Sequence, residues 1–195
     1  AGSDQWTHVL KDHESYCVFV HPGLSGTVLA GTADGVYRST DGGATFARAN
    51  FPDSKKQVWC FLVDQRDPKR IFAGASPVDV YRSEDGGASW RKLPTPKIDG
   101  RCTGPFANRV MRMVQHPSRP NEIYAAVEIN GVYRTTDGGE TWTDCSAELI
   151  RMSEREPYSS KIVTDTFAEG MLDGHAITIS PSDPDGVILA NRHRE

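Results

Sequence analysis

The sequence lacks the features that would assign it to several large classes of protein. No apolar run approaches the roughly 20 residues of a membrane span, and no hydrophobic segment resembling a secretory signal stands at the N-terminus. Basic residues do not dominate: 22 Lys and Arg against 26 Asp and Glu give a net charge of −4, which predicts no basic surface for nucleic acid. We therefore expect a soluble protein with neither a membrane nor a nucleic-acid partner, and its compartment is left open.

Metal-binding and redox cysteine motifs are also missing. The chain has four cysteines, and none of them forms a CxxC or CxH spacing. The cysteines therefore predict neither a zinc site nor a redox pair, and no cofactor is specified by the sequence. Cys17 and Cys60 lie at equivalent places in two apolar segments, where a small buried side chain fits.

One short pattern occurs three times in the chain. The copies are GVYRSTDGGATF from Gly35, DVYRSEDGGASW from Asp79 and GVYRTTDGGETW from Gly131. Each combines an alternating strand, an Asp-Gly-Gly turn and a second strand that opens with an aromatic residue. Asp-Gly favours a β-hairpin because glycine adopts positive φ without a steric penalty, and an aspartate carboxylate can accept hydrogen bonds from the turn amides. We therefore predict structural roles for the three turn aspartates, Asp41, Asp85 and Asp137.

The pattern S/T-x-D-G-G-x-T/S-W/F resembles the Asp-box, or BNR repeat, of sialidase-like, xyloglucanase-like, sortilin-like and photosystem-assembly-factor-like β-propellers. With the strands between the three copies, the resemblance covers most of the chain. It implies an all-β fold of four-stranded antiparallel blades, with each box in an outer hairpin away from the ligand face. It does not imply an activity, because one fold serves many functions. The Arg-Ile-Pro signature of true sialidases is absent, and no xyloglucanase catalytic motif is recognisable.

The spacing of the repeats divides the chain into blades. His21, Asp64 and His116 stand at equivalent positions, 20 or 21 residues before the aspartate of their box. Within one domain over 1–195 we predict an orphan outer strand at 4–10, blade 1 at 16–50, blade 2 at 58–94, blade 3 at 109–146, a long inter-blade loop at 147–174 and the start of blade 4 at 175–195. Ser146 is predicted to cap a short helix at the start of the long loop.

Three blades and part of a fourth are fewer than the four to eight blades of single-chain propellers. By the same spacing, a fourth box would fall near position 200, past Glu195. We therefore expect an incomplete ring: either a piece of a longer propeller, or a part that a second polypeptide or a second copy completes. A compact four-blade ring lacking one strand is disfavoured, because it would leave strand edges exposed.

The connections between blades predict where a ligand would bind. From each box aspartate to the next inner strand the chain runs 19, 27 and then 39 residues, so the later connections carry insertions. Long loops on one rim of a fold commonly carry function. Polar and aromatic residues at this rim, where the inner strands begin, are the ligand-binding candidates Arg109, Arg112, Arg192, Tyr16, Trp59 and His193.

Three further residues at this rim are the catalytic candidates. Glu128 and Asp173 can form the acid/base pair that glycoside hydrolysis requires, with His175 beside them. The same three side chains could instead bind a metal, but their spacing matches no ligand motif, so no metal site is predicted. For each residue taken singly, an exposed loop charge is more often a solvated side chain.

Two functions fit these observations. The first is a hydrolytic, glycoside-hydrolase-like propeller that binds a polar, carbohydrate or anionic ligand at its central face. The second is a non-catalytic platform for binding or assembly. The readable motifs fit both because all of them are structural, and the enlarged loops favour the hydrolase.

Overall fold

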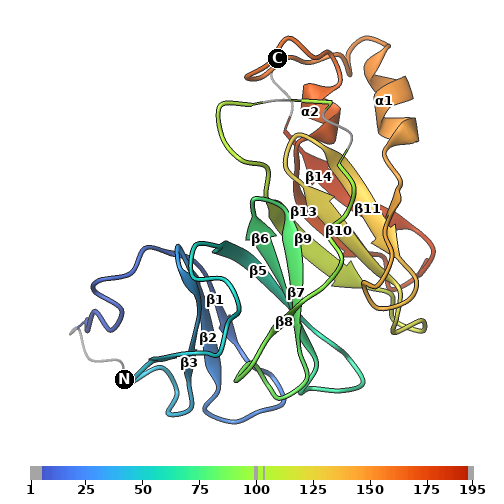
Figure 1. Ribbon diagram of the computed structural model, residues 1–195. Helices are drawn as coiled ribbons and strands as arrows, with labels where there is room; N and C mark the ends of the chain where they lie inside the picture. Colours follow the sequence, from blue (N-terminus) through green and yellow to red (C-terminus); the bar gives the residue numbers. More distant parts are fainter. Residues whose placement is uncertain (1–5, 99–100, 103, 193–195) are drawn as a thin grey trace.

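The computed structural model describes residues 6–98, 101–102 and 104–192, and antiparallel β-sheets dominate it (Figure 1). Three sheets have four strands each, and a fourth sheet has two. In each sheet the strands follow one another in chain order, which is the up-and-down order of a propeller blade. The predicted all-β propeller with three complete blades and part of a fourth is therefore confirmed.

The strands of each blade have the following bounds. Blade 1 contains β1 (Ser15–Val20), β2 (Val28–Thr32), β3 (Gly35–Ser39) and β4 (Ala47–Arg48). Blade 2 contains β5 (Gln57–Val63), β6 (Ile71–Ser76), β7 (Asp79–Ser83) and β8 (Arg91–Lys92). Blade 3 contains β9 (Val110–Gln115), β10 (Ile123–Val127), β11 (Gly131–Thr135) and β12 (Thr143–Asp144). The two strands of blade 4 are β13 (Gly174–Ile179) and β14 (Val187–Asn191).

The hydrophobic core lies between the blades, because both faces of the middle strands are buried. Strand β1 contacts β5, β5 contacts β9, and β9 contacts β13, so the first strand of each blade is the inner one. One core cluster joins blades 1 and 2 around Leu29 and Tyr81, and another joins blades 2 and 3 around Phe72 and Val110. A smaller cluster around Ile177 joins blades 3 and 4.

Each Asp-box turn is held by its own aspartate. The Asp137 carboxylate accepts hydrogen bonds from the backbone N–H of Thr141 at 2.9 Å, from its hydroxyl at 2.6 Å, and from the hydroxyl of Thr135 at 2.7 Å. The hydrogen bond from the Thr141 hydroxyl has the largest effect, and together these donors lower the pKa of Asp137 to about 2. Gly138 and Gly139 have φ values of 74° and 92°, which favour glycine. The aspartate oxygens are thus engaged by the turn itself.

The same bonds recur around the other two boxes. Asp41 accepts from Ser39 and Thr45, and Asp85 accepts from Ser83 and Ser89.

The boxes also join one blade to the next. Gly87 lies against Leu29 of blade 1, where an added Cβ would come within 2.8 Å of Leu29 Cδ2. Gly139 lies in the same way against Leu93 of blade 2, with 2.6 Å between such a Cβ and Leu93 Cδ1. These two positions thus combine a positive φ with a space too small for a side chain.

Two short helices lie at the two ends of the segment predicted as a long loop. Helix α1 spans Ala147–Ser153 and α2 spans Glu169–Leu172. Ser146 occupies the predicted N-cap position of α1, but its hydroxyl does not cap the helix. Instead it accepts a hydrogen bond from the backbone N–H of Val132 at 3.0 Å, because Ser146 is buried against strand β11. No described helix is long and apolar enough to cross a membrane.

The outer strand predicted over 4–10 is not formed within residues 6–10, and residues 4 and 5 lie outside the described residues. Trp6, its aromatic residue, is 99% exposed. An outer strand needs a third strand as its partner, and in the described part of the chain the sheet of β13 and β14 offers none.

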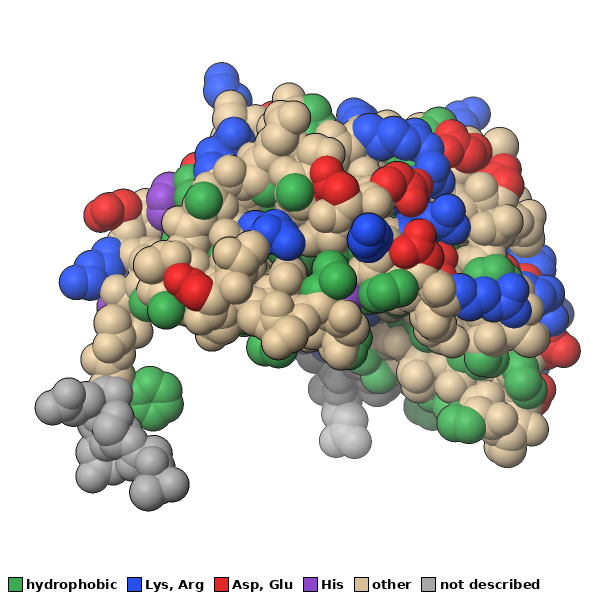
Figure 2. All heavy atoms as spheres, turned by 90° about the horizontal axis from the view of Figure 1, so that it is seen from below, with side chains coloured by type: hydrophobic (Ala, Val, Ile, Leu, Met, Phe, Trp, Pro, Cys, Tyr) green, Lys and Arg blue, Asp and Glu red, His purple; other side chains and the backbone are tan. Residues whose placement is uncertain are grey.

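On the face seen in Figure 2, acidic and basic side chains are interspersed.

Candidate functional site

A bulge marks the start of every inner strand. Strands β1, β5, β9 and β13 each insert one extra residue relative to the strand that follows, and these extra residues are Tyr16, Trp59, Met111 and His175. A β-bulge redirects a side chain away from the regular alternation of the strand. The four bulges stand at equivalent positions, so they present four side chains at one rim of the blades.

Aromatic side chains form one half of this rim. The rings of Tyr16 and Trp59 stack with centroids 4.3 Å apart and an interplanar angle of 18°. The guanidinium of Arg109 lies 4.2 Å from the centroid of Trp59 and 5.0 Å from that of Phe106. Arg109 is therefore held between two aromatic rings, in the arrangement of cation–π contacts.

Arg109 connects the aromatic half to the acidic half of the rim. Its Nε pairs with the Oε2 atom of Glu128, which follows strand β10 and is only 8% exposed. Burial raises the pKa of Glu128, and the nearby Asp173 carboxylate raises it further, while Arg109 opposes both effects. Glu128 thus retains its proton to a higher pH than an ordinary glutamic acid does.

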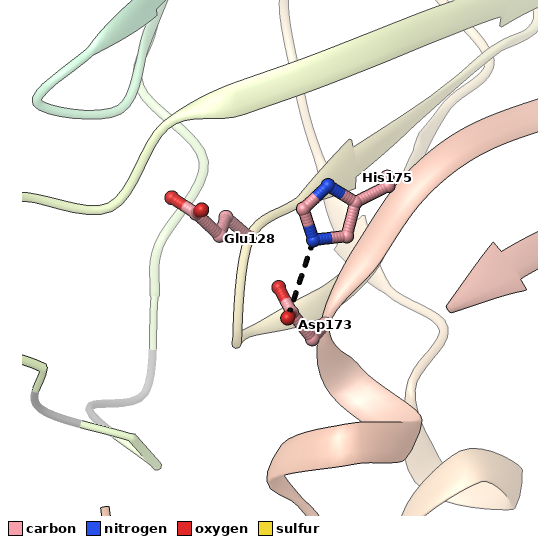
Figure 3. Close-up of side chains that lie close together, drawn as sticks. All are labelled: Glu128, Asp173 and His175. Atoms are coloured by element: carbon pink, nitrogen blue, oxygen red, sulfur yellow. Dashed lines mark ion pairs between the residues drawn. The ribbon is translucent and has the colours of Figure 1, made fainter. Parts of the chain in front are cut away.

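Asp173 and His175 complete the row on the blade 4 side. Figure 3 shows their side chains directed toward one another, and Asp173 Oδ2 lies 3.2 Å from His175 Nε2. The Asp173 side chain is 3% exposed and its Oδ1 has no hydrogen-bond partner among the described residues, whereas the imidazole is 41% exposed. Asp173 therefore orients the ring of His175 while the ring itself remains accessible. We call Tyr16, Trp59, Arg109, Glu128, Asp173 and His175 the rim row.

The position of Asp173 depends on the long loop before it. Asp173 is the C-cap residue directly after helix α2, and Glu169 in the first turn of that helix is completely buried. The Glu169 carboxylate accepts hydrogen bonds from the backbone N–H groups of Ile162, Val163 and Thr164 at 2.7–2.9 Å. Burial acts to raise the pKa of Glu169, but these donors outweigh it and lower the pKa. One buried carboxylate therefore fixes the loop that carries Asp173.

Glu128, Asp173 and His175 are also the residues that could hold a metal ion. One ligand atom from each lies within 4.8 Å of the others, and three is the number of protein ligands in many catalytic zinc sites. Ligands of a tetrahedral zinc ion are closer, about 3.4 Å apart for bonds of roughly 2.1 Å. Glu128 is moreover already paired with Arg109, so the arrangement suits an acid/base cluster better than a metal centre.

The remaining candidates stand apart from the rim row. Arg112 is exposed further along β9, and no hydrogen bond or ion pair joins its side chain to another described residue. Arg192 donates its backbone N–H to the carbonyl of Asp173 at 3.1 Å, but its exposed side chain does not join the row. His193 lies outside the described residues.

The sequence reasoning missed Met111 and Phe106 in this region. Aligning the blades on their bulges would have identified Met111, because it is equivalent to Tyr16 and Trp59. No local signal marks Phe106, whose contact with Arg109 depends on how the loop before β9 folds.

Comparison with known proteins shows that this chain is similar to one repeat family and to several enzymes. The BNR/Asp-box repeat family matches residues 133–144, which contain the third box. A probable oligoxyloglucan-reducing end-specific xyloglucanase of Neosartorya fischeri is 29% identical over 147 residues, covering 73% of this chain and 17% of that protein. This chain therefore spans less than a fifth of the length of that relative.

Solved structures give the same fold. An ancestral GH74 enzyme has a TM-score of 0.55 and 25% identity, over 66% of this chain and 18% of its own. YCF48 from Cyanidioschyzon merolae has a TM-score of 0.59 and 18% identity, over 87% of this chain and 48% of its own. The likeness to YCF48 concerns the fold alone. The likeness to the xyloglucanases extends to sequence and supports a glycoside-hydrolase-like propeller.

Proposed function

Because this chain is a β-propeller of the BNR/Asp-box repeat family, we propose that its rim row binds a carbohydrate and hydrolyses a glycosidic bond. The observation that carries the proposal is the continuity of the row. A stacked aromatic pair, an arginine and two buried carboxyl groups succeed one another without interruption from blade 1 to blade 4. Sugar binding and proton transfer would therefore take place side by side.

The aromatic half suits a sugar ring. Tyr16 and Trp59 are partly exposed, and because their rings stack on one another while Arg109 covers Trp59, a sugar would contact the exposed part of Tyr16 and the ring edges of the pair. Amphipathic aromatic side chains of this kind offer a large contact area at a small cost in conformational entropy. A sugar bound here would lie beside Arg109 and within reach of the acidic half of the row.

The acidic half supplies two different chemical roles. Glu128 is assigned as the general acid, because its raised pKa keeps a proton available for the departing oxygen. Asp173 is assigned to the basic side together with His175. When Asp173 accepts the proton of Nε2, Nδ1 is left as the unprotonated nitrogen of an accessible imidazole, able to take a proton from an attacking water.

Hydrolysis of xyloglucan oligosaccharides by the purified chain tests this proposal. We expect reducing ends to be released, and we expect Glu128→Gln and Asp173→Asn to abolish release while sugar binding remains. Glu148→Gln is the matched control, because Glu148 is an exposed glutamate on α1 whose carboxylate pairs with Arg151 and with no member of the described rim row. Unchanged release by Glu128→Gln would refute the assignment of the acid.

The non-catalytic platform is the second candidate, and the Arg109–Glu128 ion pair favours it. An arginine that neutralises the acid would leave a binding surface with no free proton donor. In that case calorimetry would detect sugar binding by the unmodified chain, without release of product over the same range of concentrations.

A further inference from the structure

We propose that the rim carries a second, cationic subsite between blades 2 and 3, and that it selects a sugar bearing a carboxylate, such as a hexuronic acid. This inference rests on the proposed binding of carbohydrate by the rim row. It adds a substrate class, because the proposed hydrolysis does not specify whether the sugar carries a charge. The subsite is a cavity lined by Lys55, Gln57, Ser76, Pro77, Phe106, Ala107 and Arg109.

The charges of the cavity favour an anion. Two of its lining residues, Lys55 and Arg109, are cationic, and no Asp or Glu lines it. Lys55 is exposed, and its ammonium pairs with no carboxylate in the described part of the chain. Arg109 uses Nε for Glu128, and its two terminal amino groups donate to no described protein acceptor. A planar carboxylate matches the unused side of a guanidinium better than a spherical anion does.

The other lining groups fit a sugar ring. The cavity has a volume of about 230 Å³, which is roughly eight water molecules at about 30 Å³ each, enough for a single ring. Phe106 and Pro77 supply apolar walls. The Gln57 side chain accepts the indole N–H of Trp59 at 3.3 Å, which leaves its NH₂ group free to donate to a hydroxyl or a carboxylate.

The cavity is continuous with the rim row through Arg109. The guanidinium that lines it is the one stacked on Trp59 and paired with Glu128. A carboxylate bound to the terminal nitrogens of Arg109 would therefore lie next to the sugar-stacking surface on one side and the proposed acid on the other. A carboxylated ring in the cavity would place its neighbouring sugar beside the aromatic pair.

Lys55 allows this inference to be tested without disturbing the proposed chemistry. It is exposed, and its ammonium forms no ion pair with a described carboxylate of the rim row, so Lys55→Gln should fold and should retain Glu128, Asp173 and His175 in place. Lys69 is a matched control. It too is exposed, and its backbone N–H donates to an aspartate two residues earlier at 3.0 Å, as that of Lys55 does at 2.9 Å.

The experiment is an NMR titration of the chain at low ionic strength with glucuronic acid, glucose and inorganic phosphate. We expect glucuronic acid to bind at least about tenfold more tightly than glucose, as one charge-assisted contact predicts. Lys55→Gln should remove most of that preference without changing glucose binding, and Lys69→Gln should behave as the unmodified chain does. Added salt should weaken glucuronic acid binding only.

Three results would overturn the subsite. These are equal binding of glucose and glucuronic acid, an undiminished preference in Lys55→Gln, or displacement of glucuronic acid by phosphate at the same concentration, which would indicate a plain anion site. The outcome is separable from that of the proposed hydrolysis. If neutral glycosides are hydrolysed and glucuronic acid binds no more tightly than glucose, only the subsite is contradicted. If glucuronic acid binds selectively and no product is released from any glycoside, only the hydrolase is contradicted.

Discussion

Arg38 in blade 1 donates a hydrogen bond from Nε to the carbonyl oxygen of Gly86, 2.9 Å away in the Asp-box turn of blade 2. Arg82 repeats the contact one blade later, from Nη1 to the carbonyl of Gly138 at 3.2 Å. Both arginines end the Val-Tyr-Arg segment of a repeat. The repeated sequence therefore specifies the bond between neighbouring blades as well as the hairpin within each blade.

Replacing Arg38 with alanine is expected to lower the free energy of unfolding by about 1.5 kcal/mol, because a partly buried carbonyl loses a charged donor. Urea denaturation measures the change. The control is Arg48→Ala, since Arg48 Nη2 donates to the carbonyl of Asp34 within blade 1 at an exposed site. That variant should lose less than about 0.5 kcal/mol, and equal losses would contradict a special role for the contact between blades.

Asp137→Ala should cost about 1–2 kcal/mol of stability at neutral pH through the lost turn hydrogen bonds, with ligand affinity unchanged. The folded pKa of about 2 lies below the ordinary value, so this contribution is present above about pH 4 and disappears as the pH falls toward 2. Urea denaturation at several pH values tests it: the variant and the unmodified chain should converge in acid. Lost ligand binding in a folded variant would contradict a structural role.

The rate of hydrolysis should depend on the protonation of Glu128. Because burial raises its pKa and the general acid must carry a proton, the rate should fall as the pH rises through that raised pKa. Glu128→Gln cannot donate a proton and should lower the rate at least about 100-fold without unfolding the chain. A pH–rate profile and circular dichroism check the two statements. If the rate of the Glu128→Gln variant still fell at high pH as that of the unmodified chain does, the fall would belong to the titration of another group.

Glu169 is expected to act as a positioning residue for Asp173. Glu169→Gln should reduce kcat while KM stays the same, because the loop loosens and the sugar-stacking surface is untouched. It should also lower the unfolding temperature near neutral pH. The lowered pKa of Glu169 means that this stabilisation is present at neutral pH and fades in acid. A change in KM alone would argue against positioning.

Trp59→Ala should weaken sugar binding by roughly tenfold or more, since a stacked aromatic surface and a cation–π partner are both lost. Trp59→Phe should retain part of the affinity. Calorimetry with one oligosaccharide measures both. Trp90 in the second box is a suitable control site, because it is buried between blades and its Trp90→Phe variant should alter stability and leave binding unchanged.

The sequence by itself determined the blade. Asp-Gly-Gly turns can be read from the chain because glycine adopts the positive φ that they need without a steric penalty, and the alternation of Val-Tyr-Arg defines the strand before each turn. Because the spacing within each blade is nearly constant, the order of the blades along the chain followed as well. The sequence also placed Glu128, Asp173 and His175 at the rim, since strand ends can be counted within a repeat.

Only the tertiary structure decided which rim residues meet. Glu128 and Asp173 are separated by 45 positions, and their approach depends on a loop that Glu169 fixes through backbone donors with no sequence signature. Arg109 joined the row because it lies just before β9, beside Glu128 at the rim, whereas Arg112 is the third residue of β9 and lies further along the strand. Contacts between loops depend on packing across blades, whereas turns and strands depend on local geometry. Local patterns therefore specified the scaffold, and packing assembled the site.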